Sequence, residues 1–138
     1  MADVLDTLHR IRKLEATRAL RALSQAQRAS DQTARGLQLI ENKLERLAQQ
    51  VPTEITAMQA KDQGAMRLET QRRTEADKLE KAATYIEKAK TNYTDAATRA
   101  RTMERMAETR RERAEAEATE KENRELEEVG LQAWWRNA

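Results

Sequence analysis

The chain has 138 residues, of which 36% are charged and 38% hydrophobic, with one Pro, three Gly, no Cys and no Phe. This composition favours helices with solvent-facing sides and argues against a sheet, because strands need the β-branched and aromatic residues that are scarce here. The absence of Cys excludes disulfides, thiol nucleophiles and Cys-ligated zinc, the net charge of +2 does not demand nucleic acid or anionic lipid, and no run approaches the ~18 apolar residues of a membrane span.

The first predicted helix covers about residues 3–50 and carries a coiled-coil seam. Asp3 is a suitable N-cap residue for it. A repeat that averages 3.5 residues keeps one narrow apolar stripe facing a partner helix. Leu8 and Ile11 lie one step out of phase with that repeat, which predicts a register shift before Ala16. The seam positions, which step by alternating three and four residues, are Ala16, Ala19, Leu23, Ala26, Ser30, Thr33, Leu37, Ile40, Leu44, Leu47 and Val51.

A connector is predicted over residues 51–65. Pro52 lacks a backbone donor and disfavours helical geometry in the residue before it, so the first helix should end just ahead of it. Gly64 marks a second break, since Gly inside a helix costs about 1 kcal/mol relative to Ala. The second helix is then expected over about residues 66–128, followed by a tail over residues 129–138.

The second helix carries a seam of the same period. Two such seams separated by a breaker segment predict a long antiparallel two-helix coiled-coil hairpin, all-α and formed as a single elongated domain over residues 1–138. If the fold-back is centred between Pro52 and Gly64, paired residue numbers sum to about 116, which sets Ser30 opposite Ile86. The seam positions are Leu68, Arg72, Glu75, Leu79, Ala82, Ile86, Ala89, Tyr93, Ala96, Ala100, Met103 and Ala107.

That register leaves the end of the second helix as an overhang. Residue 1 would lie opposite about residue 115, so residues 115–128 project roughly 20 Å beyond it. The segment is charged nearly all round, and Glu117 with Lys121 and Glu120 with Arg124 are spaced as helical ion pairs. A helix of that length without a partner either docks on one or frays.

No catalytic, metal-binding or nucleotide-binding motif is recognisable. His9 is the only His and lacks an E-x-x-H or H-x-x-x-H companion, so we expect it on the surface of the first turns. The sequence has no D-x-D-x-D-G loop, no G-x-x-x-x-G-K-[ST] and no G-x-G-x-x-G. A two-helix structure also lacks the dry pocket in which catalytic carboxylates separate their pKa values. We therefore expect a protein that is not an enzyme and that holds no cofactor and no metal.

Two segments carry a family resemblance. The run RRERAEAEATEKENRELEEVGLQ, from Arg110, resembles the end of flagellar FliJ proteins, where an Arg- and Glu-rich helix closes with a pattern like E-x-x-E-L-D-E-x-G-L. Glu127 stands where that pattern has Asp, and Trp134 and Trp135 lie outside it. The opening LDTLHRIRKLEATRALRALSQAQ is similar to the FliJ start, an Ala-rich coiled coil. The YscO group of virulence-secretion stalks shares this architecture.

The resemblance implies a non-enzymatic central stalk of a type III, flagellar-type protein export apparatus. Such a stalk lies in the pore of a hexameric export ATPase, links it to the membrane export gate, and in some members handles export chaperones. It is cytoplasmic, peripheral to the cytoplasmic face of the inner membrane through its partners, monomeric when isolated, and does not bind nucleic acid. The residues expected to face the ATPase are Leu8, Ile11, Arg110, Arg111, Arg113, Glu120, Glu122, Arg124, Glu125 and Glu128. Those expected to face the gate are Glu41, Leu44, Glu45, Gln49, Leu68 and Gln71.

Two alternatives remain open. One is a structural coiled-coil scaffold or adaptor whose seams pair between chains, which sedimentation would distinguish from a monomeric hairpin. The other is a nucleic-acid or membrane-surface binder that uses Arg21, Arg28 and Arg35, which recur every seven residues on the outermost stripe of the first helix. Such a stripe is usually a solvated face, although a single-sign stripe also steers association with acidic partners. Binding to nucleic acid would weaken steeply with salt.

Overall fold

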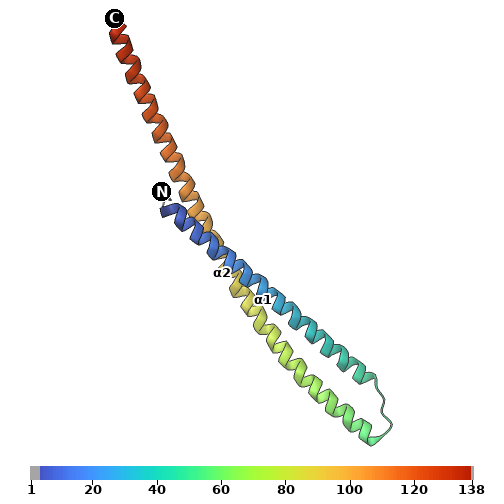
Figure 1. The fold of residues 1–138 in the computed structure, drawn as a ribbon. Coiled ribbons are helices and arrows are strands. Elements are labelled where there is room, and N and C mark those ends of the chain that lie inside the picture. Colours follow the sequence, from blue (N-terminus) through green and yellow to red (C-terminus); the bar gives the residue numbers. More distant parts are fainter. Residues whose placement is uncertain (1–3, 138) are drawn as a thin grey trace. The chain divides into compact units, whose positions relative to one another are not determined.

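Two long helices make up the protein. The computed structural model describes residues 4–137, in which α1 (Val4–Gln49) and α2 (Ile55–Asn137) are joined by a short non-helical connector (Figure 1). The two helices pack against each other and the described residues contain no strand, so the predicted all-α antiparallel hairpin is confirmed. Asp3, the predicted N-cap, lies outside the described residues. None of the described helical stretches is long and apolar enough to cross a membrane.

The helix boundaries differ from those predicted at two glycines. α1 ends at Gln49, ahead of Pro52 as expected, but α2 already begins at Ile55 and runs through Gly64. The predicted connector over residues 51–65 was therefore too long, and the predicted tail over residues 129–138 is helical as far as Asn137. The loss of about 1 kcal/mol at each Gly is too small to end a helix held by packing or by its neighbouring turns.

Contacts divide the chain into two units. One is Thr17–Asp95, in which the blue-to-teal part of α1 lies antiparallel to the green-to-yellow part of α2 (Figure 1). Its buried side chains are Leu23, Ala26 and Ala89. The other unit joins Met1–Ala16 to Ala96–Ala138, and its buried side chains are Ala96 and Ala107. The prediction of a single domain stays a prediction.

The predicted seams are the packed faces of both helices. All twelve seam positions of α2 and ten of the eleven of α1 are buried or half-buried, and the exception, Val51, lies after the end of α1. In the first turns of α1 the half-buried row runs through Leu8, Arg12 and Ala16. Two successive steps of four residues shift the register there, as a stutter does, while Ile11 is exposed.

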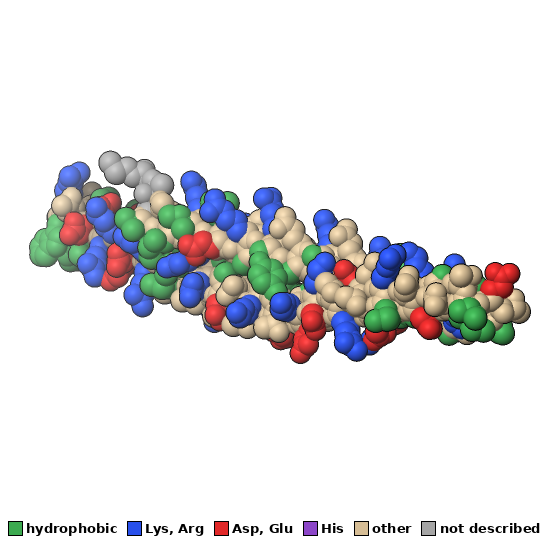
Figure 2. Space-filling model, turned by 90° about the horizontal axis from the view of Figure 1, so that it is seen from below, with side chains coloured by type: hydrophobic (Ala, Val, Ile, Leu, Met, Phe, Trp, Pro, Cys, Tyr) green, Lys and Arg blue, Asp and Glu red, His purple; other side chains and the backbone are tan. Residues whose placement is uncertain are grey.

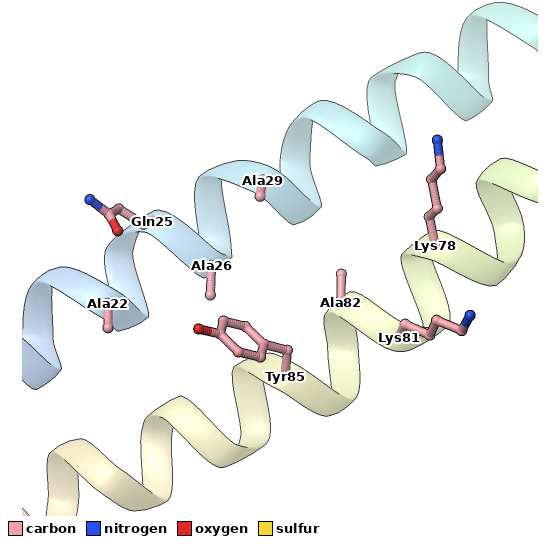
Figure 3. Close-up of a pocket in the computed structure, with 8 residues that line it drawn as sticks. All are labelled: Ala22, Gln25, Ala26, Ala29, Lys78, Lys81, Ala82 and Tyr85. Atoms are coloured by element: carbon pink, nitrogen blue, oxygen red, sulfur yellow. The ribbon is translucent and has the colours of Figure 1, made fainter.

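The register within the Thr17–Asp95 unit differs from the predicted one. Figure 3 shows Ala26 over the ring of Tyr85, and Ala29 across from Ala82, so paired residue numbers sum to 111 and the expected sum of about 116 was wrong. The Nζ of Lys61 donates a hydrogen bond to a backbone carbonyl of the connector, that of Gln50, at 2.7 Å, which gives the same sum.

The connector geometry explains this register. A non-helical chain advances up to ~3.3 Å per residue against 1.5 Å in a helix. The few residues after Gln49 therefore carry the chain past the end of α1, and the first turns of α2 run back over that distance before the two helices lie side by side. The fold-back is centred near residue 55 instead of near residue 58.

Candidate functional site

The segment of α2 that no residue of α1 covers is the largest exposed feature of the Met1–Ala16 and Ala96–Ala138 unit. Ala107 is only 3% exposed, whereas every residue from Glu108 to Asn137 is exposed. We call residues 108–137 the α2 overhang; as a helix it is roughly 45 Å long, and Figure 1 shows it in orange and red. The overhang itself was predicted, but it starts about seven residues earlier than expected, because the register differs by five residues and α1 begins at Val4 instead of residue 1.

Charge is unevenly distributed along the α2 overhang. Its first turns carry Arg110, Arg111 and Arg113, while residues 115–128 contain seven acidic and two basic side chains. The predicted ion pair between Glu120 and Arg124 forms, with 2.6 Å between a guanidinium nitrogen and a carboxylate oxygen. The other predicted pair, Glu117 with Lys121, is not among the ion pairs of the described residues. The overhang thus offers a basic surface followed by an acidic one.

The end of the α2 overhang is apolar. Leu126, Val129 and Leu131 are exposed, as are Trp134 and Trp135, which are 63% and 70% exposed. The two indole rings meet edge to face, with 5.2 Å between their centroids and 81° between their planes. A row of large apolar side chains left exposed is typical of a surface that binds a partner.

The residues predicted to face an ATPase fall in the same unit. Arg110, Arg111 and Arg113, together with the five predicted residues from Glu120 to Glu128, are all exposed on the α2 overhang. Leu8 is half-buried against α2 and Ile11 is 45% exposed. Their role in binding a partner stays a prediction.

His9 is not the surface residue that was expected. Its side chain is half-buried, and its Nδ1 is buried without a hydrogen-bond partner in the structure. The stutter explains this position, because it turns the row that includes Leu8 and Arg12 towards α2 and brings the adjacent His9 with it.

The residues predicted to face a gate lie in the Thr17–Asp95 unit. Glu41, Glu45, Gln49 and Gln71 are exposed, whereas Leu44 and Leu68 are half-buried seam residues. Leu44 lies beside residues 65–73 of α2, where both helices line an open groove of about 450 Å³. The two leucines therefore contribute to helix packing, and the four polar residues form the accessible part of this surface.

A charged cluster interrupts the apolar seam next to that groove. The Nε of Arg72 donates to both carboxylate oxygens of Glu69 at 3.1 Å. This hydrogen bond, aided by the charges of Arg72 and Arg73, holds the pKa of Glu69 below its ordinary value. The pKa of Arg72 is raised by Glu69 and, more weakly, by Glu41 of the other helix. The cluster is part of the packing between α1 and α2.

The sequence reasoning missed an apolar surface at the hairpin tip. Val51, which had been assigned to the seam, is 87% exposed, and Ile55 and Met58 are exposed beside it. Pro52 and Leu47 line an open groove of about 620 Å³ in the same place. The error followed from placing Ile55 and Met58 in a connector, when they form the first turn of α2.

A second missed feature is a groove lined by small residues in the half of the Thr17–Asp95 unit that is farther from the connector. It has a volume of about 500 Å³ and is lined by alanines from both helices and by Tyr85, with Lys78 and Lys81 at its edge (Figure 3). The wrong register had hidden the pairing of Tyr85 with Ala26.

On the face seen in Figure 2, basic and acidic side chains alternate with small apolar patches. The three arginines that were predicted to form the outermost stripe of α1, Arg21, Arg28 and Arg35, are exposed.

Among the described residues, no three His, Asp or Glu side chains gather as they would around a metal ion.

Comparison with known proteins identifies the family. No curated protein and no solved structure matches the chain. The model of the flagellar FliJ protein family matches residues 1–138, its full length. The chain therefore belongs to the flagellar FliJ family, which makes it a protein of flagellar biosynthesis and of the flagellar export apparatus.

Proposed function

We propose that this protein is the central stalk of its export apparatus, which binds the hexameric export ATPase through the α2 overhang and contacts the membrane export gate through the Thr17–Asp95 unit. The observation that carries the proposal is the overhang itself. It is a helix of roughly 45 Å that no residue of α1 covers, with three arginines in its first turns and an acidic run over residues 115–128. A helix this exposed gains stability when a partner covers it.

The stalk acts by differential binding and carries out no chemistry. A helix that binds the assembled ring more tightly than separate subunits shifts the equilibrium towards the ring, and it biases subunit conformations to the extent that its affinities for them differ. Arg110, Arg111 and Arg113 supply a basic surface for acidic groups of the ring lumen, and the acidic run after them contacts basic groups.

The gate contact is assigned to the hairpin tip and the adjoining outer faces. The four accessible polar residues Glu41, Glu45, Gln49 and Gln71 lie along the two helices that lead to the exposed apolar tip of Val51, Ile55 and Met58. An apolar centre with a polar rim is the usual composition of a protein interface. The proposal includes binding of export chaperones, as the family resemblance implies, without assigning a surface to it. With a gate contact of this kind, we propose that the protein works at the cytoplasmic face of the inner membrane.

The test measures ATP hydrolysis by the purified hexamer-forming export ATPase with and without the full-length protein. The informative variant replaces Arg110, Arg111 and Arg113 by Glu, which changes only exposed side chains. We expect stimulation by the natural protein and its loss in this variant. The matched control replaces Arg21, Arg28 and Arg35 by Glu, an equal charge change on exposed positions of the other unit, and should retain stimulation. Equal turnover with and without the natural protein would remove the proposal's main support.

A further inference from the structure

The stripe of α2 that faces α1 as far as Ala107 continues along the same side of the helix into the α2 overhang. There its positions are exposed, and five of the eight carry charged side chains instead of apolar ones. The continued positions are Arg110, Ala114, Glu117, Lys121, Arg124, Glu128, Leu131 and Trp135. A second helix laid along this stripe would have to match its charges, as charged positions do when they set partner and orientation in coiled coils.

The stripe is complementary to itself when it is reversed. In an antiparallel pair whose residue numbers sum to 238, Arg110 lies opposite Glu128 and Glu117 opposite Lys121. Ala114 then lies opposite Arg124, a small residue against a long one. Every charged pair on the stripe joins opposite signs, and a two-fold axis repeats each pair. We propose that two copies of this chain pair antiparallel through their α2 overhangs in this register.

Neighbouring registers lack this complementarity. A shift that lowers the sum by seven sets Arg110 opposite Lys121, and a shift that raises it by seven sets Glu117 opposite Glu128 and Lys121 opposite Arg124. Like charges directly opposite each other disfavour a helix pair, so charge selects one register.

The flanking positions support the same register. Arg111 comes level with Glu127 of the second copy, and Arg113 with Glu125, so the arginines of the first turns meet the acidic run. Leu131 and Trp135 come level with Ala107 and Met103 of the second copy, a face that α1 of that copy covers, so the pairing is confined to residues 108–130.

The inference does not rest on the proposed function. The pairing uses the face that the proposed function assigns to the ATPase, so the two contacts exclude each other. An overhang that is paired with a second copy is protected until the ring replaces that copy. Self-association is measured without the ATPase, and a failure of one proposal therefore leaves the other standing.

Sedimentation equilibrium of the full-length chain over a range of concentrations tests the pairing. One variant carries Arg110→Glu and Arg111→Glu, and a second carries Glu127→Arg and Glu128→Arg. The natural chain should move from a mass of 15.9 kDa towards twice that mass as concentration rises. Each variant alone should raise the dissociation constant by roughly tenfold or more, because it places like charges opposite each other. An equimolar mixture of the two variants should recover the affinity of the natural chain.

Two outcomes would overturn the pairing. One is a natural chain that stays monomeric up to its solubility limit, and the other is a pair of variants that dimerise as tightly alone as when mixed. Circular dichroism should show unchanged helix content in both variants, since all four substituted side chains are exposed. Added salt should weaken the natural dimer, because exposed ion pairs are screened.

Cysteine pairs test the register directly, since the chain has no Cys of its own. An Ala114→Cys chain mixed with an Arg124→Cys chain should form the mixed disulfide on oxidation. Neither chain should link to itself, because its two copies of the residue lie roughly 15 Å apart along the axis, beyond the ~7 Å that a disulfide spans. Thr119→Cys, on the opposite face of the helix, is the control that should not link. Ready self-linking of Ala114→Cys would mean a parallel pair and overturn the proposal.

Discussion

Very few side chains form the core of the hairpin. Leu23 is the largest of the buried side chains, and the others, Ala26 and Ala89 in the same unit and Ala96 and Ala107 in the other, are all alanines. Alanine seams let two helices approach closely but bury little apolar area per residue, so stability depends strongly on the occasional large residue.

Substitution of Leu23 should show this dependence. We expect Leu23→Ala to lower the free energy of unfolding by about 2 kcal/mol, because it removes buried methyl groups and leaves a gap between the helices. Leu39, which is 61% exposed, is the control, and Leu39→Ala should cost less than about 0.5 kcal/mol. Urea unfolding followed by circular dichroism at 222 nm measures both. Equal losses would contradict the packing described for Leu23.

Gly64 offers the opposite case, a residue whose replacement should stabilise the hairpin. A Cβ added to Gly64 would lie 3.5 Å from Cδ2 of Leu47, an ordinary van der Waals distance. Gly64→Ala should therefore raise the free energy of unfolding by roughly 0.5–1 kcal/mol through helix propensity. Gly130→Ala, in the α2 overhang, should raise helix content without changing the unfolding midpoint of the hairpin. A loss of stability in Gly64→Ala would show that Leu47 cannot accommodate the methyl group.

Glu69 should make stability depend on pH. Its pKa is lowered in the folded protein by the hydrogen bond from Arg72, so its contribution is fully present above its unfolded pKa and is lost as pH falls through the folded pKa. Glu69→Gln should be less stable than the natural protein at neutral pH, and the difference should shrink below about pH 4. Thermal unfolding across pH measures this, with Glu80→Gln, also on α2, as the control. A difference that persists unchanged at low pH would contradict this role of the Glu69 carboxylate.

At the scale of the helices, positions along each seam follow from the sequence, whereas their register does not. The seam positions follow from the alternating spacing of three and four residues, which can be recognised in the sequence of one helix alone. The register depends on how many residues the connector takes to turn back, and two breakers of unequal strength, Pro52 and Gly64, made that ambiguous. Only Pro52 ends a helix, because Gly64 packs beneath Leu47 as part of α2.

Paired cysteines distinguish the observed register from the predicted one. Ala26→Cys with Tyr85→Cys in one chain should form an intramolecular disulfide, because the two side chains face each other (Figure 3). Ser30→Cys with Ile86→Cys, a pair from the predicted register, should not, since these residues are about five positions out of alignment and exceed the ~7 Å span of a disulfide. Mass measurement before and after oxidation under dilute conditions reads out both variants, and a disulfide only in the second would restore the predicted register.

At the scale of the whole molecule, the two parts of α2 have different roles. As far as Ala107 the helix is stabilised by α1, and beyond it the helix depends on its own ion pairs and on partners. Several features of the candidate site could be predicted from the sequence: the overhang, its charge and its exposed tryptophans. The burial of His9, the apolar tip and the groove beside Tyr85 could not, because each depends on the stutter or on the register.

Truncation after Ala114 should separate the two parts. Because the last residue of α2 that α1 covers is Ala107, removal of the α2 overhang beyond Ala114 should leave the free energy of unfolding of the hairpin within about 0.5 kcal/mol of the full-length value, a limit typical of changes away from packed contacts. Helix content should fall in proportion to the residues removed. The measurement is made at low concentration, where self-association is absent. A large loss of stability would show that the overhang folds back onto the hairpin.

The sequence by itself determined that this chain forms two helices with matched seams, that the helices pair with each other, and that α2 extends beyond α1. These features follow from the period of each seam, from Pro52 and from the lengths of the two helical segments, which are local properties of the sequence. Only the tertiary structure decided which residues meet. A helix accepts a glycine such as Gly64 when packing offsets its cost, and the path of the connector then sets the register for the hairpin. That register places the start of the α2 overhang after Ala107, level with the first residues of α1.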